Sequence, residues 1–205
     1  MGARQQQKLA TRARVLTAAR ELFNEIGYED ATVRAIAQRA SVSVGSVFTT
    51  FTSKSDILSQ VMLERLDGLY KELGQLAPHL RGSMADRCRS IFAVHYAFEM
   101  RQVKLFLAHI AASYAWRNDP STIPYGRNAH LRGMLMDGLR SGVQRGEIRA
   151  DADLDLTVDL LMAAYAWNYR LATSQGASPD DLIALMDRQI GVIFDGVDSR
   201  EGSAT

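Results

Sequence analysis

Residues 31–54 read ATVRAIAQRASVSVGSVFTTFTSK, and this stretch decides the fold. Its apolar periodicity predicts two short helices joined by a tight turn, followed by the start of a third helix. Thr32 and Ser43 stand just before the two short helices and are residue types that cap helix N-termini. One inward apolar face runs through both helices and consists of Val33, Ile36, Ala37, Ala40, Val42, Val47 and Phe51. The stretch therefore predicts a helix-turn-helix.

The outward face of the second short helix carries small or hydrogen-bonding side chains, namely Val44, Ser46, Thr49 and Thr50. The sequence offers no core for them to fill, and a helix with such a face fits the major groove of DNA. A helical hairpin that binds nothing has the same periodicity, so periodicity alone leaves both interpretations open.

The order and spacing of these residues resemble the helix-turn-helix of tetracycline-repressor (TetR) type transcriptional regulators, whose motif reads roughly ATVxxIAxxAGVSxGxxYxxFxSKxxL. In this chain ATVRAIAQRA is followed by VSVGSVFTTFTSKSDIL. Residues 14–28, RVLTAARELFNEIGY, resemble the family's first helix. The resemblance implies an N-terminal three-helix DNA-binding domain, followed by a helical domain that binds a ligand and dimerises.

Three features depart from that motif. Ser41 stands where the turn usually has Gly, which costs about 1 kcal/mol if φ is positive there. Phe48 replaces Tyr and lacks a hydroxyl that would reach a phosphate, while Thr49 and Thr50 replace residues that are often bulky. The fold prediction survives these changes, but the family's base preferences do not carry over.

The positions of the polar side chains predict how each meets DNA. Thr32 lies at a helix N-terminus, where a hydroxyl and backbone N–H groups suit a phosphate. Arg34 follows in the first turn, and we expect it at the DNA backbone or a groove edge. Base-edge contacts are expected from Ser43, Val44, Ser46 and Thr49. Contacts to the sugar-phosphate backbone are expected from Phe48, Thr50 and Lys54.

The basic residues are concentrated near the N-terminus. Residues 1–54 carry eight Lys/Arg and four Asp/Glu, a net charge of +4, whereas residues 55–205 carry sixteen and nineteen, a net charge of −3. Arg4, Lys8, Arg12 and Arg14 predict an arm that reaches the adjacent minor groove. Because the recognition helix lacks Arg, Gln and Asn, we expect few bidentate base contacts. DNA shape and contacts to thymine methyl groups should then contribute more to the sequence specificity.

The composition is that of an ordinary globular protein, with 47% hydrophobic and 23% charged residues. We expect no membrane span, because no run of 18 apolar residues occurs. The first residues lack the apolar core of a secretory signal. A single cysteine, Cys88, excludes an internal disulfide and is typical of a reducing compartment. These features predict a cytoplasmic protein.

Helical periodicity continues through the chain without strand-like alternation, so the predicted fold is all-α with about nine helices. The first helix is expected to end at Gly27 and to bury Leu9, Leu16, Ala19, Phe23 and Ile26. Ser53 to Asp56 resemble a capping box that opens a helix ending before Pro78. Further helices are expected over 83–100, 102–116, 127–145, 154–174 and 180–197. The helix over 102–116 is apolar nearly all round, which predicts enclosure by others.

The last two helices carry more apolar residues than one core face needs. In the first of them, one stripe is Leu154, Val158, Leu161 and Tyr165, and another is Leu156, Leu160, Ala163 and Trp167. In the second, Leu182, Met186, Ile193 and Val197 lie beside Ile183, Ile190 and Phe194. The surplus faces predict a homodimer with two-fold symmetry through a four-helix interface. A fully enclosed core in a monomer is the alternative.

No motif for catalysis or metal binding occurs: a Gly-rich phosphate loop, HExxH, CxxC and GxSxG are all missing. We therefore predict no catalytic residue, no metal and no cofactor. Aromatic and sulfur-bearing side chains of the C-terminal helices predict an apolar pocket for a hydrophobic or aromatic small molecule. These side chains are His95, Phe98, Met100, Phe106, His109, Tyr114, Trp116, Met134, Tyr165 and Trp167. Ordinary core filling is the alternative for each of them.

The predicted domains are residues 1–54 for DNA binding and 55–198 for ligand binding and dimerisation, with a disordered tail at 199–205. The resemblance implies a homodimeric repressor that binds palindromic double-stranded DNA and is released when a small molecule shifts the helix beginning near Lys54. Two alternatives stay open. One is an activator or constitutive DNA binder without a ligand, and the other is a helical enzyme or adaptor.

Overall fold

The structure is a computed structural model, and it describes residues 2–113 and 129–198. It is all-helical as predicted, and the only extended pairing among these residues is an isolated bridge between Ile148 and Asp198. The expected loop at 118–126, the tail at 199–205, and Tyr114 and Trp116 lie outside the described residues.

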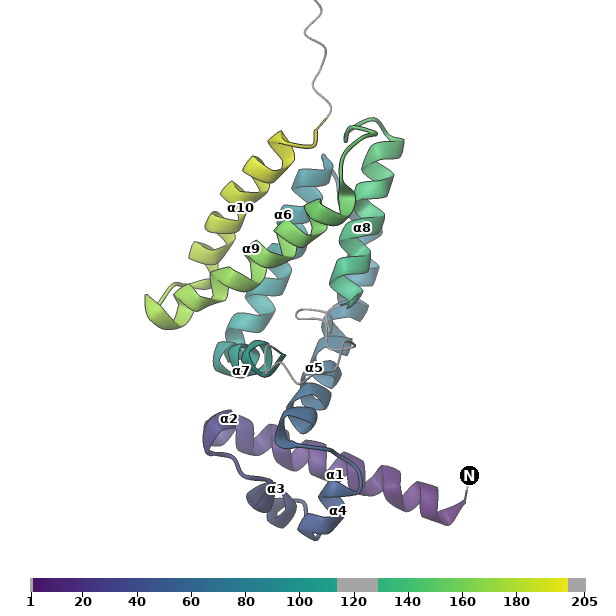
Figure 1. Cartoon of the computed structure of the whole chain (residues 1–205), viewed down its shortest axis with the longest axis vertical. Helices are drawn as coiled ribbons and strands as arrows, with labels where there is room; N and C mark the ends of the chain where they lie inside the picture. The colour runs from purple at the N-terminus through teal and green to yellow at the C-terminus, as the bar shows by residue number, and fades with distance from the viewer. Residues whose placement is uncertain (1, 114–128, 199–205) are drawn as a thin grey trace, which may run out of the picture. The chain divides into compact units, whose positions relative to one another are not determined.

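Every expected helix has a counterpart in the described residues, and a four-residue helix, α2, adds to them (Figure 1). The α-helices are α1 (Ala3–Glu25), α2 (Gly27–Asp30), α3 (Val33–Arg39), α4 (Val44–Phe48), α5 (Lys54–Leu76), α6 (Met84–Glu99), α7 (Val103–Ser113), α8 (Ala129–Gln144), α9 (Leu154–Ser174) and α10 (Pro179–Asp195). Two 3₁₀ turns, η1 (Ala77–His79) and η2 (Met100–Gln102), follow α5 and α6.

Helices α3 and α4 form because each has a polar cap and an apolar inward face. Thr32 Oγ1 accepts the N–H of Ala35 at 3.1 Å, and Ser43 Oγ accepts the N–H of Ser46 at 3.0 Å. Ile36 and Val47 are completely buried. The predicted caps are therefore confirmed, and the predicted inward face is buried except at Val33 and Val42, which are half-buried. Helix α1 packs against both helices.

The buried face of α1 differs from the one predicted. Leu16, Ala19 and Phe23 are buried as expected, but Leu9 and Ile26 are about half exposed. Both lie at the ends of α1, outside the central segment that is buried, and Val15, Ala18 and Leu22 complete the buried face instead. Gly27, at φ 85°, ends α1 as predicted, in a conformation that favours glycine.

The expected N-terminal arm is part of a helix, because residues 3–25 form one continuous α1. Arg12 donates to Gln60 Oε1 at 2.6 Å and lies 3.6 Å from Glu64 Oε1, so it holds α1 against α5. The contact of this segment with the minor groove stays a prediction.

The start of α5 is capped, although not by the complete box that the sequence predicted. Ser53 Oγ accepts the N–H of Asp56 at 3.0 Å. The Asp56 carboxylate, however, accepts the N–H and the hydroxyl of Thr52, one residue earlier than a capping box requires. The buried face of the helix is as expected, with Ile57, Leu66 and Leu73 among its members.

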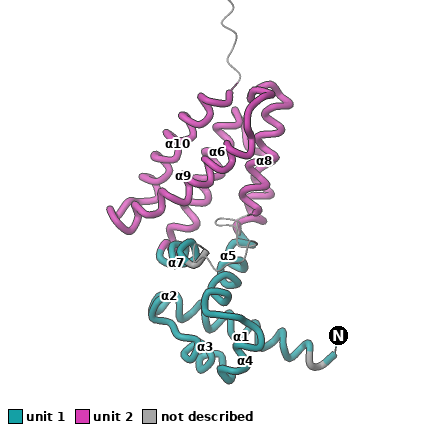
Figure 2. The backbone as a smooth tube through the Cα atoms, viewed as in Figure 1, with its two compact units in different colours: residues 1–68, 104–115 teal, residues 69–103, 116–205 magenta. Residues whose placement is uncertain are grey.

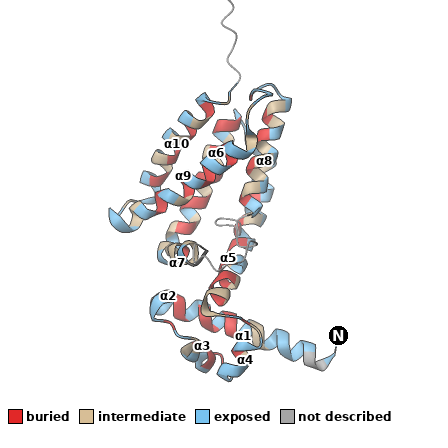
Figure 3. Ribbon diagram, viewed as in Figure 1, coloured by how far each residue is buried: buried red, intermediate tan, exposed pale blue. Residues whose placement is uncertain are grey.

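The C-terminal helices form a layered bundle in which α10 packs on α6 and α9, and α8 packs on α6 and α9. Figure 3 marks the buried positions in red. In α10 the buried face is Leu182, Met186, Ile190 and Phe194, spaced four residues apart. The sequence assigned Ile193 and Val197 to the stripe of Leu182, but both are only half-buried. Ile193 lies about 100° around the helix from the buried Phe194, so it points away from the buried face.

Helix α7 is less enclosed than predicted. Of its described side chains only Leu105 and Phe106 are buried. Ala108 and Ala111 contribute to the apolar composition, but a methyl group offers little area, so leaving it accessible to water costs little. Composition alone therefore overstated the burial of this helix.

Two compact units divide the chain (Figure 2). One contains residues 1–68 and 104–115, and the other contains residues 69–103 and 116–205. Helix α5 contributes to both units. The predicted domain limits at residues 54 and 198 stay predictions, because compactness does not establish which segment folds on its own.

Ser41 has φ 54°, so the cost of a non-glycine residue at positive φ applies at this turn. The Ser41→Gly variant should raise the free energy of unfolding by up to about 1 kcal/mol, because glycine adopts this conformation without strain. Ser41→Ala retains a Cβ atom and should bring no such gain. Urea unfolding monitored by circular dichroism measures both, and equal stability of the two variants would contradict the assignment of strain to Ser41.

Candidate DNA-binding surface

The exposed face of α4 is made of small and apolar side chains. Val44 is 39% exposed and Phe48 is 55% exposed, whereas Val47 between them is completely buried. Ser43 and Thr49 are exposed at the two ends of the helix. Phe48 lies on the same side of α4 as Val44, one helical turn away. The structure therefore brings the predicted recognition residues to one surface.

The hydroxyl groups of this surface already have local partners. Ser43 Oγ and Ser46 Oγ lie 2.8 Å apart, and Thr49 Oγ1 donates to the carbonyl of Ser46 at 2.7 Å. A hydroxyl that donates within the helix keeps its lone pairs, so Thr49 can accept from a base amino group and present its methyl group to thymine. These bonds fix the side chains before any contact with DNA.

Thr32 and Arg34 are exposed at the start of α3, as a phosphate-binding role requires. Arg39, at the other end of α3, has a structural role instead. Its guanidinium makes two 2.9 Å hydrogen bonds to the carboxylate of Glu25 in α1. This bidentate pair lowers the pKa of the Glu25 carboxyl below its ordinary value. The pair fixes α3 against the first helix.

Lys54 is held by the protein itself. Its ammonium donates to the carbonyls of Tyr28 at 2.8 Å and Glu29 at 3.1 Å, and it lies 4.3 Å from the centroid of the Tyr28 ring. An ammonium has three hydrogens, so one is left for a phosphate. Lys54 therefore connects the start of α5 to α2, and its phosphate contact stays a prediction. Thr50, beside Phe51, is half-buried.

The structure brings two predicted ligand residues together in the second unit. Tyr165 Oη lies 3.3 Å from His95 Nδ1, and both side chains are buried. Sequence reasoning missed the rest of this polar cluster, which consists of Tyr70, Tyr96, Glu99, Asn168 and Tyr169. The spacing of Tyr165, Asn168 and Tyr169 on one helical face was a signal that could have found three of its members.

The cluster is a buried network rather than an open cavity. Tyr96 donates to the carbonyl of Tyr165 at 3.2 Å, and Asn168 donates to Tyr96 Oη at 3.1 Å. Asn168 and Gln189 exchange two hydrogen bonds of 2.7 and 3.1 Å. Burial, and next the charge of Glu99, raise the pKa of Tyr165 well above its ordinary value.

The other predicted ligand residues lie apart from this cluster. Trp167 is 61% exposed on the outer side of α9, and Met134 lines a groove along α8. Phe98 is half-buried, while Phe106 and His109 belong to the first unit. Within the described parts of the chain, no group of three His, Cys, Asp or Glu side chains is placed to bind a metal ion. No helix described here is long and apolar enough to cross a membrane.

The sequence model described as "Bacterial regulatory proteins, tetR family" matches residues 15–61, which include α3, α4 and their turn. Residues 15–61 are therefore similar to the N-terminal part of TetR-family regulators. The chain is 29% identical to the HTH-type transcriptional regulator UidR of Escherichia coli K12 over 157 residues, covering 74% of this chain and 76% of UidR. It is 24% identical to the HTH-type transcriptional repressor KstR2 of Rhodococcus jostii over 192 residues, 94% of this chain and 93% of KstR2.

Among solved structures, this chain resembles Thermus thermophilus FadR, a TetR-family transcriptional repressor, in complex with lauroyl-CoA. The TM-score is 0.75 with 24% identity, over 95% of this chain and 98% of FadR. This likeness shows that the fold extends beyond the helix-turn-helix into the C-terminal helices. The comparisons therefore support a transcription regulator of the TetR type that binds DNA.

We predict that Thr49→Ala relaxes the base preference at one or two positions of the bound DNA. The change removes one methyl and one hydroxyl from the exposed face, and one lost base contact is worth about 1–3 kcal/mol. Competition binding with single-base variants of the DNA measures the loss. Thr17→Ala, on the exposed side of α1, is the matched control. An unchanged preference profile in Thr49→Ala would contradict the assignment.

The buried His95 predicts a pH-dependent stability. Burial lowers the pKa of His95 from 6.5 to about 3. Below pH 6.5 the unfolded chain binds a proton that the folded chain does not, so the free energy of unfolding falls by about 1.4 kcal/mol per pH unit toward pH 3. His95→Gln removes this contribution. Urea unfolding at pH 7, 6 and 5 should therefore give converging stabilities, and parallel curves would contradict a neutral buried imidazole.

Proposed function

We propose that the chain is a ligand-responsive repressor that binds a palindromic operator as a homodimer and is released by a small-molecule effector. The observation that carries the DNA-binding part is the exposed face of α4, capped by Ser43 and fixed by the buried Val47. A major groove admits an α-helix, and the exposed side of α4 carries short side chains at Val44 and Thr49 beside the ring of Phe48.

An exposed apolar face of α9 and α10 supports the homodimer. Trp167 is 61% exposed and Val192 is 75% exposed, and with Leu160 they border a hollow of about 720 Å³ between the two helices. An apolar patch of this kind is typical of an interface. Two-fold pairing through it gives a four-helix contact and places two copies of α4 in one particle.

Two recognition helices in one dimer predict two half-sites about one DNA turn apart, roughly 34–36 Å, and therefore a palindromic operator. The cationic N-terminal segment supports a steep salt dependence of binding. Thermus thermophilus FadR was solved with lauroyl-CoA, which supports a small molecule as effector here. Release requires that the ligand binds the DNA-free conformation more tightly than the DNA-bound one.

A mobility-shift assay with the DNA upstream of the chain's own gene tests this proposal. We expect retardation at low salt, loss of the complex as salt rises, and release when the effector is added. Binding without release by any candidate ligand would favour a constitutive regulator. No binding to genomic DNA would exclude the proposal altogether.

Val192→Asp should abolish the dimer, because it places a charge on each side of the proposed apolar interface. Light scattering should give the mass of one chain, and operator affinity should fall at least about 100-fold because both half-sites no longer bind together. Leu76→Asp, an exposed apolar residue at the end of α5, is the control. A Val192→Asp variant that stays dimeric and binds operator normally would contradict this interface.

A further inference from the structure

A groove of about 540 Å³ lies in the second unit, between the end of α5, α6 and α8. Its walls are mostly apolar and include Leu80, Met84, Ile91 and Met134. Met84 and Ile91 lie seven residues apart on one face of α6, so the wall is continuous along two helical turns. The size and lining are those of a small-molecule site.

Arg87 lies on the same face of α6, between Met84 and Ile91, and lines the groove. The side chain is half-buried, and its Nε is completely buried without a hydrogen-bond partner. Within the described ranges, residues 2–113 and 129–198, no hydrogen bond or ion pair to Arg87 is formed. An unpartnered buried N–H on a charged group is costly unless a ligand accepts it.

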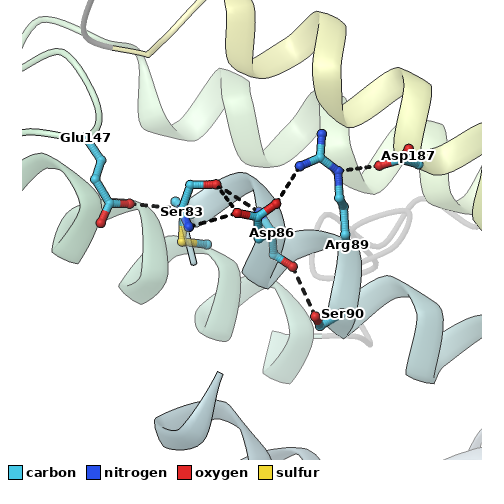
Figure 4. Close-up of polar contacts among 7 residues, drawn as sticks. Ser83, Asp86, Arg89, Ser90, Glu147 and Asp187 are labelled. Atoms are coloured by element: carbon cyan, nitrogen blue, oxygen red, sulfur yellow. Dashed lines mark hydrogen bonds and ion pairs between the residues drawn. The ribbon is translucent and has the colours of Figure 1, made fainter. Parts of the chain in front are cut away.

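The acidic side chains near Arg87 are all engaged elsewhere. Glu147 feels the charge of Arg87, but its carboxylate accepts the N–H of Met84 at 2.9 Å and Arg145 Nε at 2.6 Å. The Asp86 carboxylate accepts the hydroxyl of Ser83 and pairs with Arg89. Arg89 also pairs with Asp187 (Figure 4). The guanidinium of Arg87 is therefore the group in this neighbourhood whose charge lacks a direct partner.

The acidic residue of the groove lining, Asp137, is not paired with Arg87 either. Asp137 in α8 lies 3.7 Å from Arg140 and is largely exposed. The other polar side chains of the lining are Ser141 and His130, and the His130 ring stacks on Tyr70. Arg87 thus adds a cation to a mostly apolar lining in which Asp137 lies beside Arg140.

We propose that this groove binds an amphipathic monoanion, with its carboxylate on Arg87 and its apolar body along Met84, Ile91 and Met134. The inference rests on the proposed function, since it names the chemical class of the effector. A guanidinium matches a carboxylate with two parallel hydrogen bonds. A single cation balances one negative charge, so a monocarboxylate fits this groove better than a phosphate dianion.

Calorimetric titration of the full chain with decanoate, decanol and decyl phosphate, each below its aggregation concentration, tests the proposal. We expect decanoate to bind about 10-fold or more tightly than decanol, and more tightly than decyl phosphate. Arg87→Met keeps an unbranched apolar side chain without the charge and should reduce decanoate affinity to that of decanol. Arg20→Met removes an exposed cation of α1 that does not line the groove and should leave the preference intact.

A second variant tests the location of the apolar body. Gly133 lines the groove, and a Cβ atom there would meet nothing within 4 Å. Gly133→Leu should therefore fold normally and fill the groove, which weakens decanoate and decanol alike by about 10-fold or more. Circular dichroism checks the fold of every variant.

Three results would overturn the inference: equal affinity for decanoate and decanol, equal loss in Arg87→Met and Arg20→Met, or no binding by the folded wild-type chain. Operator release is measured separately. Decanoate that binds through Arg87 without releasing operator would contradict the proposed function and leave the groove assignment standing. Operator release by a ligand whose affinity is unchanged in Arg87→Met would support the proposed function and contradict the groove assignment.

Discussion

The function of this chain depends on holding a helix that is too short to be stable alone. Helix α4 has five residues, and isolated helices shorter than about 12–15 residues are marginal in water. Burial of Val47 and the Ser43 cap supply the stability that the helix propensity of these residues does not. Packing on α1 and α3 is therefore the condition on which the exposed face, and all DNA recognition, rests.

The same constraint explains the chemistry of that face. Only one side of α4 can pack, so the other side keeps Val44, Phe48 and Thr49 exposed, while local hydrogen bonds hold the hydroxyls. Such a surface offers methyl contacts and single hydrogen bonds rather than bidentate ones, so DNA shape carries part of the specificity. Lys54 also helps to hold these helices in place, because it connects α5 to the backbone of α2.

The sequence predicted the helices and the caps at Thr32 and Ser43, because these follow from local spacing and residue type. It did not predict which apolar residues of α1 and α10 are buried, since Leu9 and Ile193 fit a stripe yet lack a neighbour to cover them. Partners distant in the chain, such as Arg12 with Gln60 and His95 with Tyr165, follow from tertiary packing alone. For that reason the DNA-binding surface was predictable from the motif, while the polar cluster and the Arg87 groove were not.

Dimethyl sulfate footprinting tests the central claim most directly, because the reagent methylates guanine N7 in the major groove and adenine N3 in the minor groove. If the exposed face of α4 enters the major groove twice per particle, guanine N7 should be protected in two patches about 10 base pairs apart. Protection of adenine N3 alone, or of neither atom at a bound site, would contradict the account.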